Sequence, residues 1–179
     1  MSALGLASGS VRLAAPDAGW AGAYADEAAR IRAAVGGLPV AVEHVGSTAV
    51  PGLVAKPILD LLLGRPADVP GEAYVAPLAA LGYVHRGPYG IPGREYFVRD
   101  DAAGLRTHHL HLVREGSALW RDHLAFRDAL RADPALAAEY AALKRALAAA
   151  HAADREAYTD GKGAFVRRVL RLAGADPGA

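Results

Sequence analysis

The segment VGSTAVPGLVAKPILD holds several side chains that could do chemistry within a short stretch: two hydroxyls, a lysine and a carboxylate. Gly46 directly follows an apolar run, and a glycine there lets the backbone turn without a Cβ. The hydroxyls of Ser47 and Thr48, with nearby amides, could then contact an anion. The spacing is not the GxxxxGKS or GxxxxGKT pattern of the ATPase phosphate loop. We expect a phosphate contact at this turn, and an ordinary tight turn is the alternative.

Asp60 interrupts the run PILDLLLG, which is otherwise typical of a central strand buried on both faces. An unpaired carboxylate in such a place would cost on the order of several kcal/mol. Asp60 therefore lies near a strand end, pairs with Lys56 or an arginine, or binds a metal ion. A hard divalent cation, Mg²⁺ or Mn²⁺, facing the Gly-Ser turn is the functional interpretation.

The segment THHLHLV places a histidine pair in a predicted strand. Strand alternation puts His109 and His111 on one face and His108, Leu110 and Leu112 on the other. If the leucines face the core, the pair faces an open surface, where two imidazoles can bind a metal or act as acid and base. Structural histidines with hydrogen-bond partners are the alternative.

The chain has 20 lysines and arginines, and only three of them are lysines: Lys56, Lys144 and Lys162. In such an arginine-rich chain, a lysine that persists suggests a need for a compact ammonium, and we expect these three to bind phosphate. Arg94 and Arg99, on the strand beside the histidines, could bind phosphate bidentately. A solvated strand face would explain both arginines equally well.

Apolar spacing and turn residues predict the elements that must position these side chains. Strands are expected at 40–45, 58–63, 83–85, 95–99 and 107–113, with a short edge strand at 11–13. Helices are expected at 20–35, 73–81 and 119–131, from Asp133-Pro134 onward, and through Phe165, Val169 and Leu172. This order predicts an α+β (or α/β) fold, a small mixed sheet with a helical C-terminal third.

Composition places the chain among soluble globular proteins. Its 179 residues fit one domain, 53% are hydrophobic and 22% charged, and the net charge of +1 favours neither nucleic acid nor a membrane as partner. Cysteine is absent and no signal peptide or membrane span is recognisable, so we expect a cytoplasmic protein. The expected domain is 11–173, with the sheet in 11–115 and helices in 119–173, between loose tails at 1–10 and 174–179.

Several segments together resemble the GrpB family, in the same order along the chain: EHVGSTAVPGLVAKPILD, LGY, REYFVR, HLHLV, FRDALRADP, YAALK and Y...K..FV. The resemblance runs from about Val11 to Ala173. It implies membership of the nucleotidyltransferase superfamily, in which Gly46 and Ser47 would hold the terminal phosphates of a nucleotide and Asp60 a divalent metal. The family is also similar to a domain fused to dephospho-CoA kinase in some actinobacterial proteins.

The sequence departs from the superfamily pattern of acidic residues. Two-metal transfer normally needs a second carboxylate two residues after the first and a third on a later strand. Leu62 stands at the second position, and the later strand offers His109 and His111. Losing two anionic ligands should weaken Mg²⁺ binding, unless Glu43 or Glu95 substitutes or a softer metal is used.

Three functions therefore stay open. The first is a metal-assisted nucleotidyl- or phosphoryltransferase acting on a small molecule, with a nucleoside triphosphate as candidate ligand, and this enzyme is our leading expectation. The second is a non-catalytic module that binds a nucleotide or CoA-like ligand. The third is another metal-dependent reaction at Asp60, His109 and His111, resembling a two-histidine, one-carboxylate site.

Overall fold

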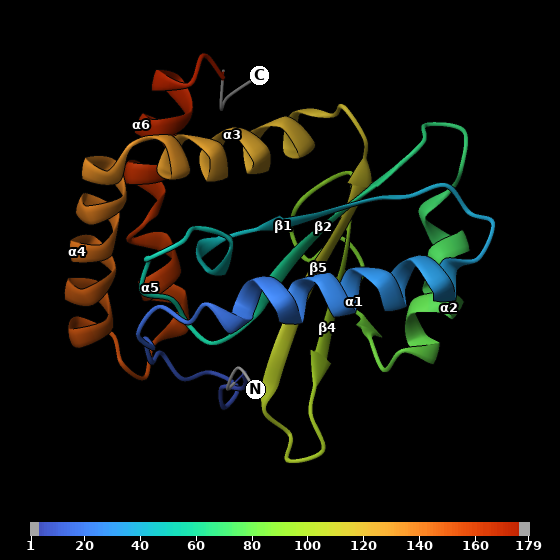
Figure 1. Cartoon of the computed structure of the whole chain (residues 1–179), viewed down its shortest axis with the longest axis horizontal. Coiled ribbons are helices and arrows are strands. Elements are labelled where there is room, and N and C mark those ends of the chain that lie inside the picture. Colours follow the sequence, from blue (N-terminus) through green and yellow to red (C-terminus); the bar gives the residue numbers. More distant parts are fainter. Residues whose placement is uncertain (1–3, 176–179) are drawn as a thin grey trace.

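The computed structural model describes residues 4–175 and is built on one five-stranded mixed sheet (Figure 1). The strands lie in the order β1-β2-β5-β4-β3. β2 and β5 are parallel, and every other neighbouring pair is antiparallel. Their bounds are β1 Ala41–Val45, β2 Leu59–Arg65, β3 Val84–His85, β4 Arg94–Asp100 and β5 Arg106–Arg114.

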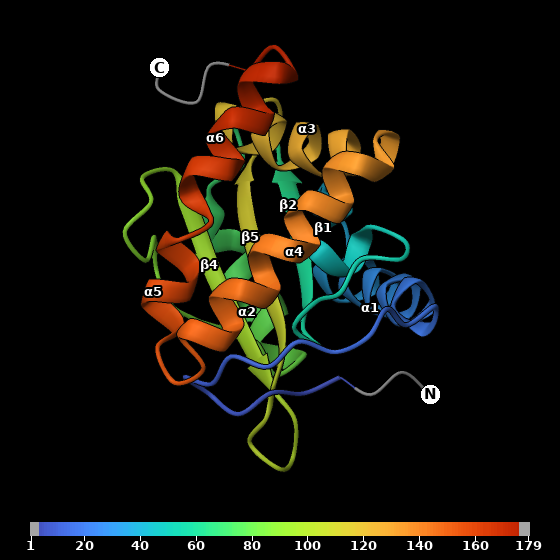
Figure 2. The same ribbon diagram turned by 90° about the vertical axis from the view of Figure 1, so that its left-hand side faces the viewer.

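The helices fall into two groups that lie apart from one another (Figures 1 and 2). α1 and α2 form one group, and α3 to α6, which make up the C-terminal third, form the other. Their bounds are α1 Gly19–Val35, α2 Val75–Ala80, α3 Ala118–Ala132, α4 Pro134–Ala150, α5 Arg155–Asp160 and α6 Gly163–Leu172. Two short 3-10 helices are η1 Ser47–Ala49 and η2 Gly71–Tyr74.

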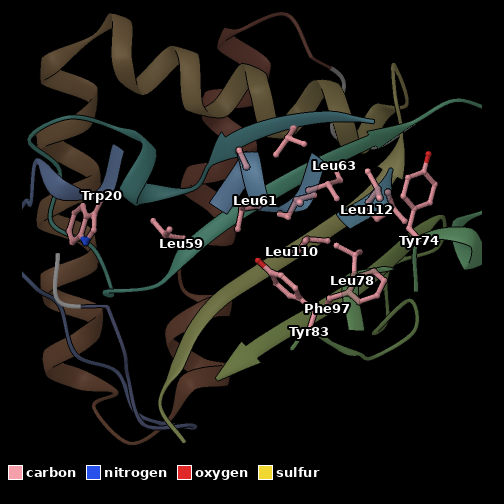
Figure 3. Close-up of a cluster of buried hydrophobic side chains, with 14 of the residues drawn as sticks. Trp20, Leu59, Leu61, Leu63, Tyr74, Leu78, Tyr83, Phe97, Leu110 and Leu112 are labelled. Carbon is pink, nitrogen blue, oxygen red and sulfur yellow. The ribbon is translucent and has the colours of Figure 1, made fainter. Parts of the chain in front are cut away.

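One face of the sheet forms the main core with α1 and α2 (Figure 3). Leu59, Leu61 and Leu63 alternate along β2 onto this face and are fully buried. Leu110 and Leu112 do the same on β5, as the period-two pattern of a strand requires. Burying this much leucine and aromatic surface is the main stabilising term of the fold.

The opposite face of the sheet is covered by the C-terminal helices. Leu62 and Val113 pack against Trp120 of α3, while a further cluster joins the loop after η1 to α3, α4 and α6. That face also carries Asp60 and His109, because they alternate with the core leucines. The same alternation that builds the core therefore sends these polar side chains toward the C-terminal helices.

Most predicted elements are confirmed with small shifts of their ends. The expected edge strand at 11–13 is wrong: the N-terminal segment makes two isolated bridges instead, from Leu6 to Arg106 and from Ala14 to Ala55. The N-terminal segment, expected to be a loose tail, packs against the sheet at Leu6, which is buried and exchanges backbone hydrogen bonds with Arg106. Most of the predicted C-terminal tail lies outside the described residues.

Helix α5 was not predicted from the sequence. Asp154 caps its first turn by accepting a hydrogen bond from the amide of Ala157 at 3.0 Å. With only six residues, the helix is too short to show an apolar period. Within residues 4–175, no helix has the length and hydrophobicity needed to cross a membrane.

Candidate functional site: a cationic pocket between the sheet and the C-terminal helices

A cavity of about 500 Å³ lies where the sheet, the η1 turn and helices α3 to α5 meet, and we call it the Ser47 pocket. This volume suits a small-molecule ligand. Its polar lining residues are Ser47, Thr48, Lys56, Asp60, Arg94, His109, His111, His123, Lys144, Arg155, Thr159 and Lys162.

Strand register explains why the Gly-Ser turn and Asp60 open onto one pocket. Val45, the last residue of β1, pairs with Asp60 of β2, so the turn that follows lies directly beside the carboxylate. Gly46 has a φ of 71°, and a Cβ on it would lie 2.9 Å from the Cβ of Asp60. Glycine is therefore required here both by its backbone conformation and by the close approach of the two chains.

Asp60 is paired with His109, and not with Lys56 or an arginine. The parallel register of β2 and β5 sets the two residues side by side, and Nδ1 of His109 lies 3.0 Å from Oδ1 of Asp60. Burial opposes ionisation of Asp60, but the hydrogen bond and nearby positive charges outweigh it and hold the pKa of Asp60 below its ordinary value. Burial lowers the pKa of His109, against the pull of Asp60.

The Nε2 atom of His109 is buried and has no hydrogen-bond partner among the described residues. His111 lies nearby on the same face, where its ring packs against those of Tyr96 and His123. Burial, with His123 beside it, lowers the pKa of His111 well below its ordinary value. Burial therefore favours the neutral form of both rings.

All three lysines of the chain line the Ser47 pocket. Burial lowers the pKa of Lys144 to about 7, and the nearby positive charge of Lys162 adds to the effect. Burial, with Lys56 as neighbour, lowers the pKa of Lys162 to about 8. Burial also lowers the pKa of Lys56, although Asp60 opposes this. The ring of Tyr158 lies under both Lys56 and Lys162, at 5.7 and 4.5 Å from its centroid.

Lys144 of α4 forms hydrogen bonds with the Gly-Ser turn and with the segment that follows it. Its side chain is 1% exposed, and Nζ donates to the hydroxyl of Ser47 at 2.9 Å and to the carbonyl of Val54. Thr48 contributes less to the pocket, because its hydroxyl is engaged with the ring of His44 at 3.0 Å.

The two predicted arginines lie on opposite faces of the sheet. Arg94 lines the pocket, and its guanidinium also donates to the carbonyls of Pro88 and Tyr89, which fixes the loop before β4. Arg99 lies beneath α1, where it pairs with Glu27 at 2.5 Å and contacts His108. The structure therefore does not bring Arg99 to the site. It lies five positions after Arg94, and an odd offset along a strand places the two side chains on opposite faces.

Several pocket residues were missed by sequence reasoning. Arg155, Tyr158 and Thr159 come from α5, the unpredicted helix, and His123 comes from α3. Two signals in the sequence could have indicated this helix. Asp154 is a good N-cap residue, and Tyr158 lies four positions before Lys162, a spacing that places the two side chains on one helical face.

The donor set of the pocket does not fit the expected Mg²⁺ or Mn²⁺ site. Asp60 is the only carboxylate among the lining residues, and His111 faces the guanidinium of Arg94, with Nδ1 3.4 Å from Nη1. No group of three or more His, Cys, Asp or Glu side chains in residues 4–175 is placed to hold a metal ion. Glu43 and Glu95 do not substitute, since they pair with Arg127 and His85 outside the pocket.

Fold and site together define an α+β protein with a cationic pocket between its mixed sheet and its C-terminal helices. The sequence profile described as GrpB protein matches residues 10–172. The chain therefore belongs to the GrpB family.

Curated relatives and a solved structure agree with this membership. The glutamate-rich protein GrpB of Alkalihalophilus pseudofirmus is 34% identical, with 93% of this chain and 98% of that protein aligned. The UPF0157 protein YqkA of Bacillus subtilis is 37% identical over 83% of this chain, which spans only 43% of YqkA. The crystal structure of the conserved protein GrpB from Enterococcus faecalis superposes with a TM-score of 0.82 and 32% identity, covering 90% of this chain and 96% of that one.

Two similarities are weaker. A dephospho-CoA kinase of Mycolicibacterium paratuberculosis is 28% identical over 94% of this chain, which corresponds to 47% of that enzyme. The Cid1 poly(U) polymerase superposes with a TM-score of 0.42 and 10% identity over 76% of this chain and 47% of Cid1, too little to support an argument about function.

Proposed function

We propose that the protein binds a phosphate-bearing small molecule, a nucleotide or a CoA-like compound, in the Ser47 pocket. The observation that carries the proposal is the excess of basic groups in the lining: five basic side chains line the pocket, with a single carboxylate, Asp60. The five are Lys56, Lys144, Lys162, Arg94 and Arg155.

The cations of the pocket are not neutralised by the protein itself. None of the five forms an ion pair with a carboxylate in the part of the chain that the structure describes. The lowered pKa values of Lys144 and Lys162 show that gathering and burying these charges is unfavourable. An anion in the pocket would relieve this cost, and phosphate offers several oxygens to several donors at once.

Isothermal titration calorimetry tests the proposal with pyrophosphate, ATP, CTP, CoA and adenosine, each with Mg²⁺, with Mn²⁺ and with EDTA. We expect the phosphate-bearing ligands to bind and adenosine not to bind. Because the pocket supplies one carboxylate, binding should persist in EDTA. Failure of every phosphate compound to bind would refute the proposal.

A matched pair of variants ties binding to the pocket. Lys162→Met removes a cation that lines it, while Arg167→Met removes an exposed cation of α6 outside it. A charged hydrogen bond contributes about 1.5–3 kcal/mol, so Lys162→Met should weaken pyrophosphate binding about tenfold or more. Arg167→Met should leave it within about twofold. Equal losses would show that binding depends on overall charge and not on the pocket.

A further inference from the structure

Anion binding alone does not require the hydrogen bond between Ser47 and Lys144. A lysine that served only as a phosphate ligand would turn its ammonium toward the cavity. Lys144 is instead 1% exposed, and its Nζ is held between the Ser47 hydroxyl, at 2.9 Å, and the carbonyl of Val54. Ser47 is partly exposed and lines the pocket, so its hydroxyl lies between the amine and the ligand space.

The surroundings of Lys144 make the neutral amine accessible near pH 7. Burial, followed by the charges of Lys162 and Arg145, lowers its pKa to about 7, and Asp60 opposes them. The ring of Tyr140, 4.7 Å from Nζ, completes the enclosure. A neutral amine can donate one hydrogen to the carbonyl of Val54 and still accept the hydroxyl hydrogen of Ser47 on its lone pair.

We propose that Ser47 is a nucleophile in the Ser47 pocket and that Lys144 accepts its proton, with the phosphorus atom of a bound phosphoanhydride or phosphate ester as the electrophile. This inference rests on the proposed binding of phosphate compounds. A serine hydroxyl is a weak nucleophile unless an adjacent base takes its proton, and hydrogen-bond contact between the two is the geometry this requires.

The proposed reaction has two steps: transfer of the phosphoryl group to Ser47, and hydrolysis of the resulting phosphoserine. The Oγ atom of Ser47 bonds to phosphorus as the bond to the leaving oxygen breaks, and that oxygen takes the electron pair. The hydroxyl proton passes to Nζ of Lys144 and then to the leaving oxygen. Water afterwards attacks the phosphoserine, which releases inorganic phosphate and restores the hydroxyl. The cations around Ser47 stabilise the charge that develops on the phosphate oxygens.

A fluorophosphonate probe tests the nucleophile without requiring the natural ligand, since it phosphonylates an activated serine with loss of fluoride. Mass spectrometry of the digested protein should find one adduct, on Ser47. Ser10, a partly exposed serine whose hydroxyl donates to the carbonyl of Ala7, serves as internal control and should stay unlabelled. Absence of a Ser47 adduct, or equal labelling of Ser10, would overturn the proposal.

The role of Lys144 is tested by the pH profile of labelling and by two substitutions. In the unmodified protein the rate should rise with pH with a midpoint near 7, where Lys144 loses its proton. Because a positioned base contributes about 10²–10⁴-fold, Lys144→Met should slow labelling at least about 100-fold. Lys144→Arg keeps the charge but cannot accept a proton at neutral pH, so it should be equally slow.

Recovery of labelling in Lys144→Arg would show that charge alone matters and would overturn the proton-acceptor role. A flat pH profile of the unmodified protein would do the same, and it requires no variant to fold. Pyrophosphate calorimetry separates this inference from the binding function. Binding without Ser47 labelling would overturn this inference and leave the binding function standing. Labelling without phosphate binding would overturn the binding function and, with it, the phosphate electrophile.

Discussion

Several residues of the Ser47 pocket have pKa values or backbone conformations that a solvent-exposed chain would not adopt. Lys144 is buried and Lys162 is partly buried, and their pKa values are lowered to about 7 and about 8. Gly46 adopts a φ of 71° directly against Asp60. Such features persist only where the surrounding structure enforces them, and they concentrate at functional sites.

Lys162 predicts how ligand binding depends on pH. A bound phosphate favours its charged form, so binding takes up a proton near pH 8 and weakens as the pH rises above that value. Lys56, Arg155 and Asp60 face Lys162 in the same pocket, and of these Lys56 and Arg155 lower its pKa. Calorimetry of pyrophosphate binding in buffers of different ionisation enthalpy should detect the uptake. Tighter binding at pH 9 than at pH 7 would contradict this account.

Substitution of Gly46 should have a steric effect, and the same substitution of a second glycine serves as the control. Gly46→Ala should lose about 1–3 kcal/mol of stability to its backbone conformation, φ 71° and ψ −170°, which is essentially restricted to glycine, and more to the clash with Asp60. Gly52 also has a positive φ, of 76°, but open space around the position of a Cβ, so Gly52→Ala should show backbone strain without a clash. Urea denaturation should therefore show the larger loss for Gly46→Ala, which should also lose pyrophosphate binding. Equal losses of stability would mean that the contact with Asp60 relaxes freely.

At the scale of elements, the pocket depends on helices that only the C-terminal third provides. α4 carries Lys144, and α5 carries Arg155 and Tyr158. The helices in turn begin at capping residues: Asp133 accepts from two amides at the start of α4, at 2.8 and 3.1 Å, and Ser117 accepts one longer bond of 3.3 Å at the start of α3.

These caps predict a difference in stability. Loss of a good N-cap costs about 1 kcal/mol, within a range of about 0.5–2. Asp133→Ala should lie at the upper end of this range, because it removes two bonds and a carboxylate that complements the helix dipole. Ser117→Ala should lie at the lower end. The midpoint of urea denaturation measures both, and a larger loss for Ser117→Ala would contradict the assignment.

Across the whole molecule, two buried histidines on the α1 side of the sheet couple folding to pH. Burial lowers the pKa of His44 to about 4, against the pull of Asp60. Burial lowers the pKa of His108 to about 4 as well, with Arg99 adding to the effect. Both rings are neutral in the folded protein, whereas in the unfolded chain each would titrate near 6.5.

Stability should therefore be complete above about pH 6.5 and fall as the pH drops toward 4, because the unfolded chain binds protons that the folded protein excludes. At about 1.36 kcal/mol per unit of pKa shift, each histidine accounts for a loss on the order of 3 kcal/mol across this range. Urea denaturation between pH 7 and 4.5 measures the slope. His44→Gln, which cannot titrate there, should reduce it, and an unchanged slope in this variant would refute the contribution of His44.

Local sequence patterns were enough to predict the five strands, the helices other than α5, and the face on which His109 and His111 lie. Those features rest on local rules, namely the period of two in strands, the capping of α4 by Asp133 and the turn at Gly46. The scarcity of lysine likewise singles out Lys56, Lys144 and Lys162, and all three line one pocket. The phosphate roles given to these residues remain predictions.

Which of these residues meet was settled only by the packing of the whole chain. Strand register paired Asp60 with His109, and helix packing brought Lys144 to Ser47 across 97 positions. Packing also left Asp60 as the only carboxylate that lines the pocket. No local pattern could fix these outcomes, because register and helix docking depend on how the whole apolar surface is buried, and a side chain's partner follows from that packing.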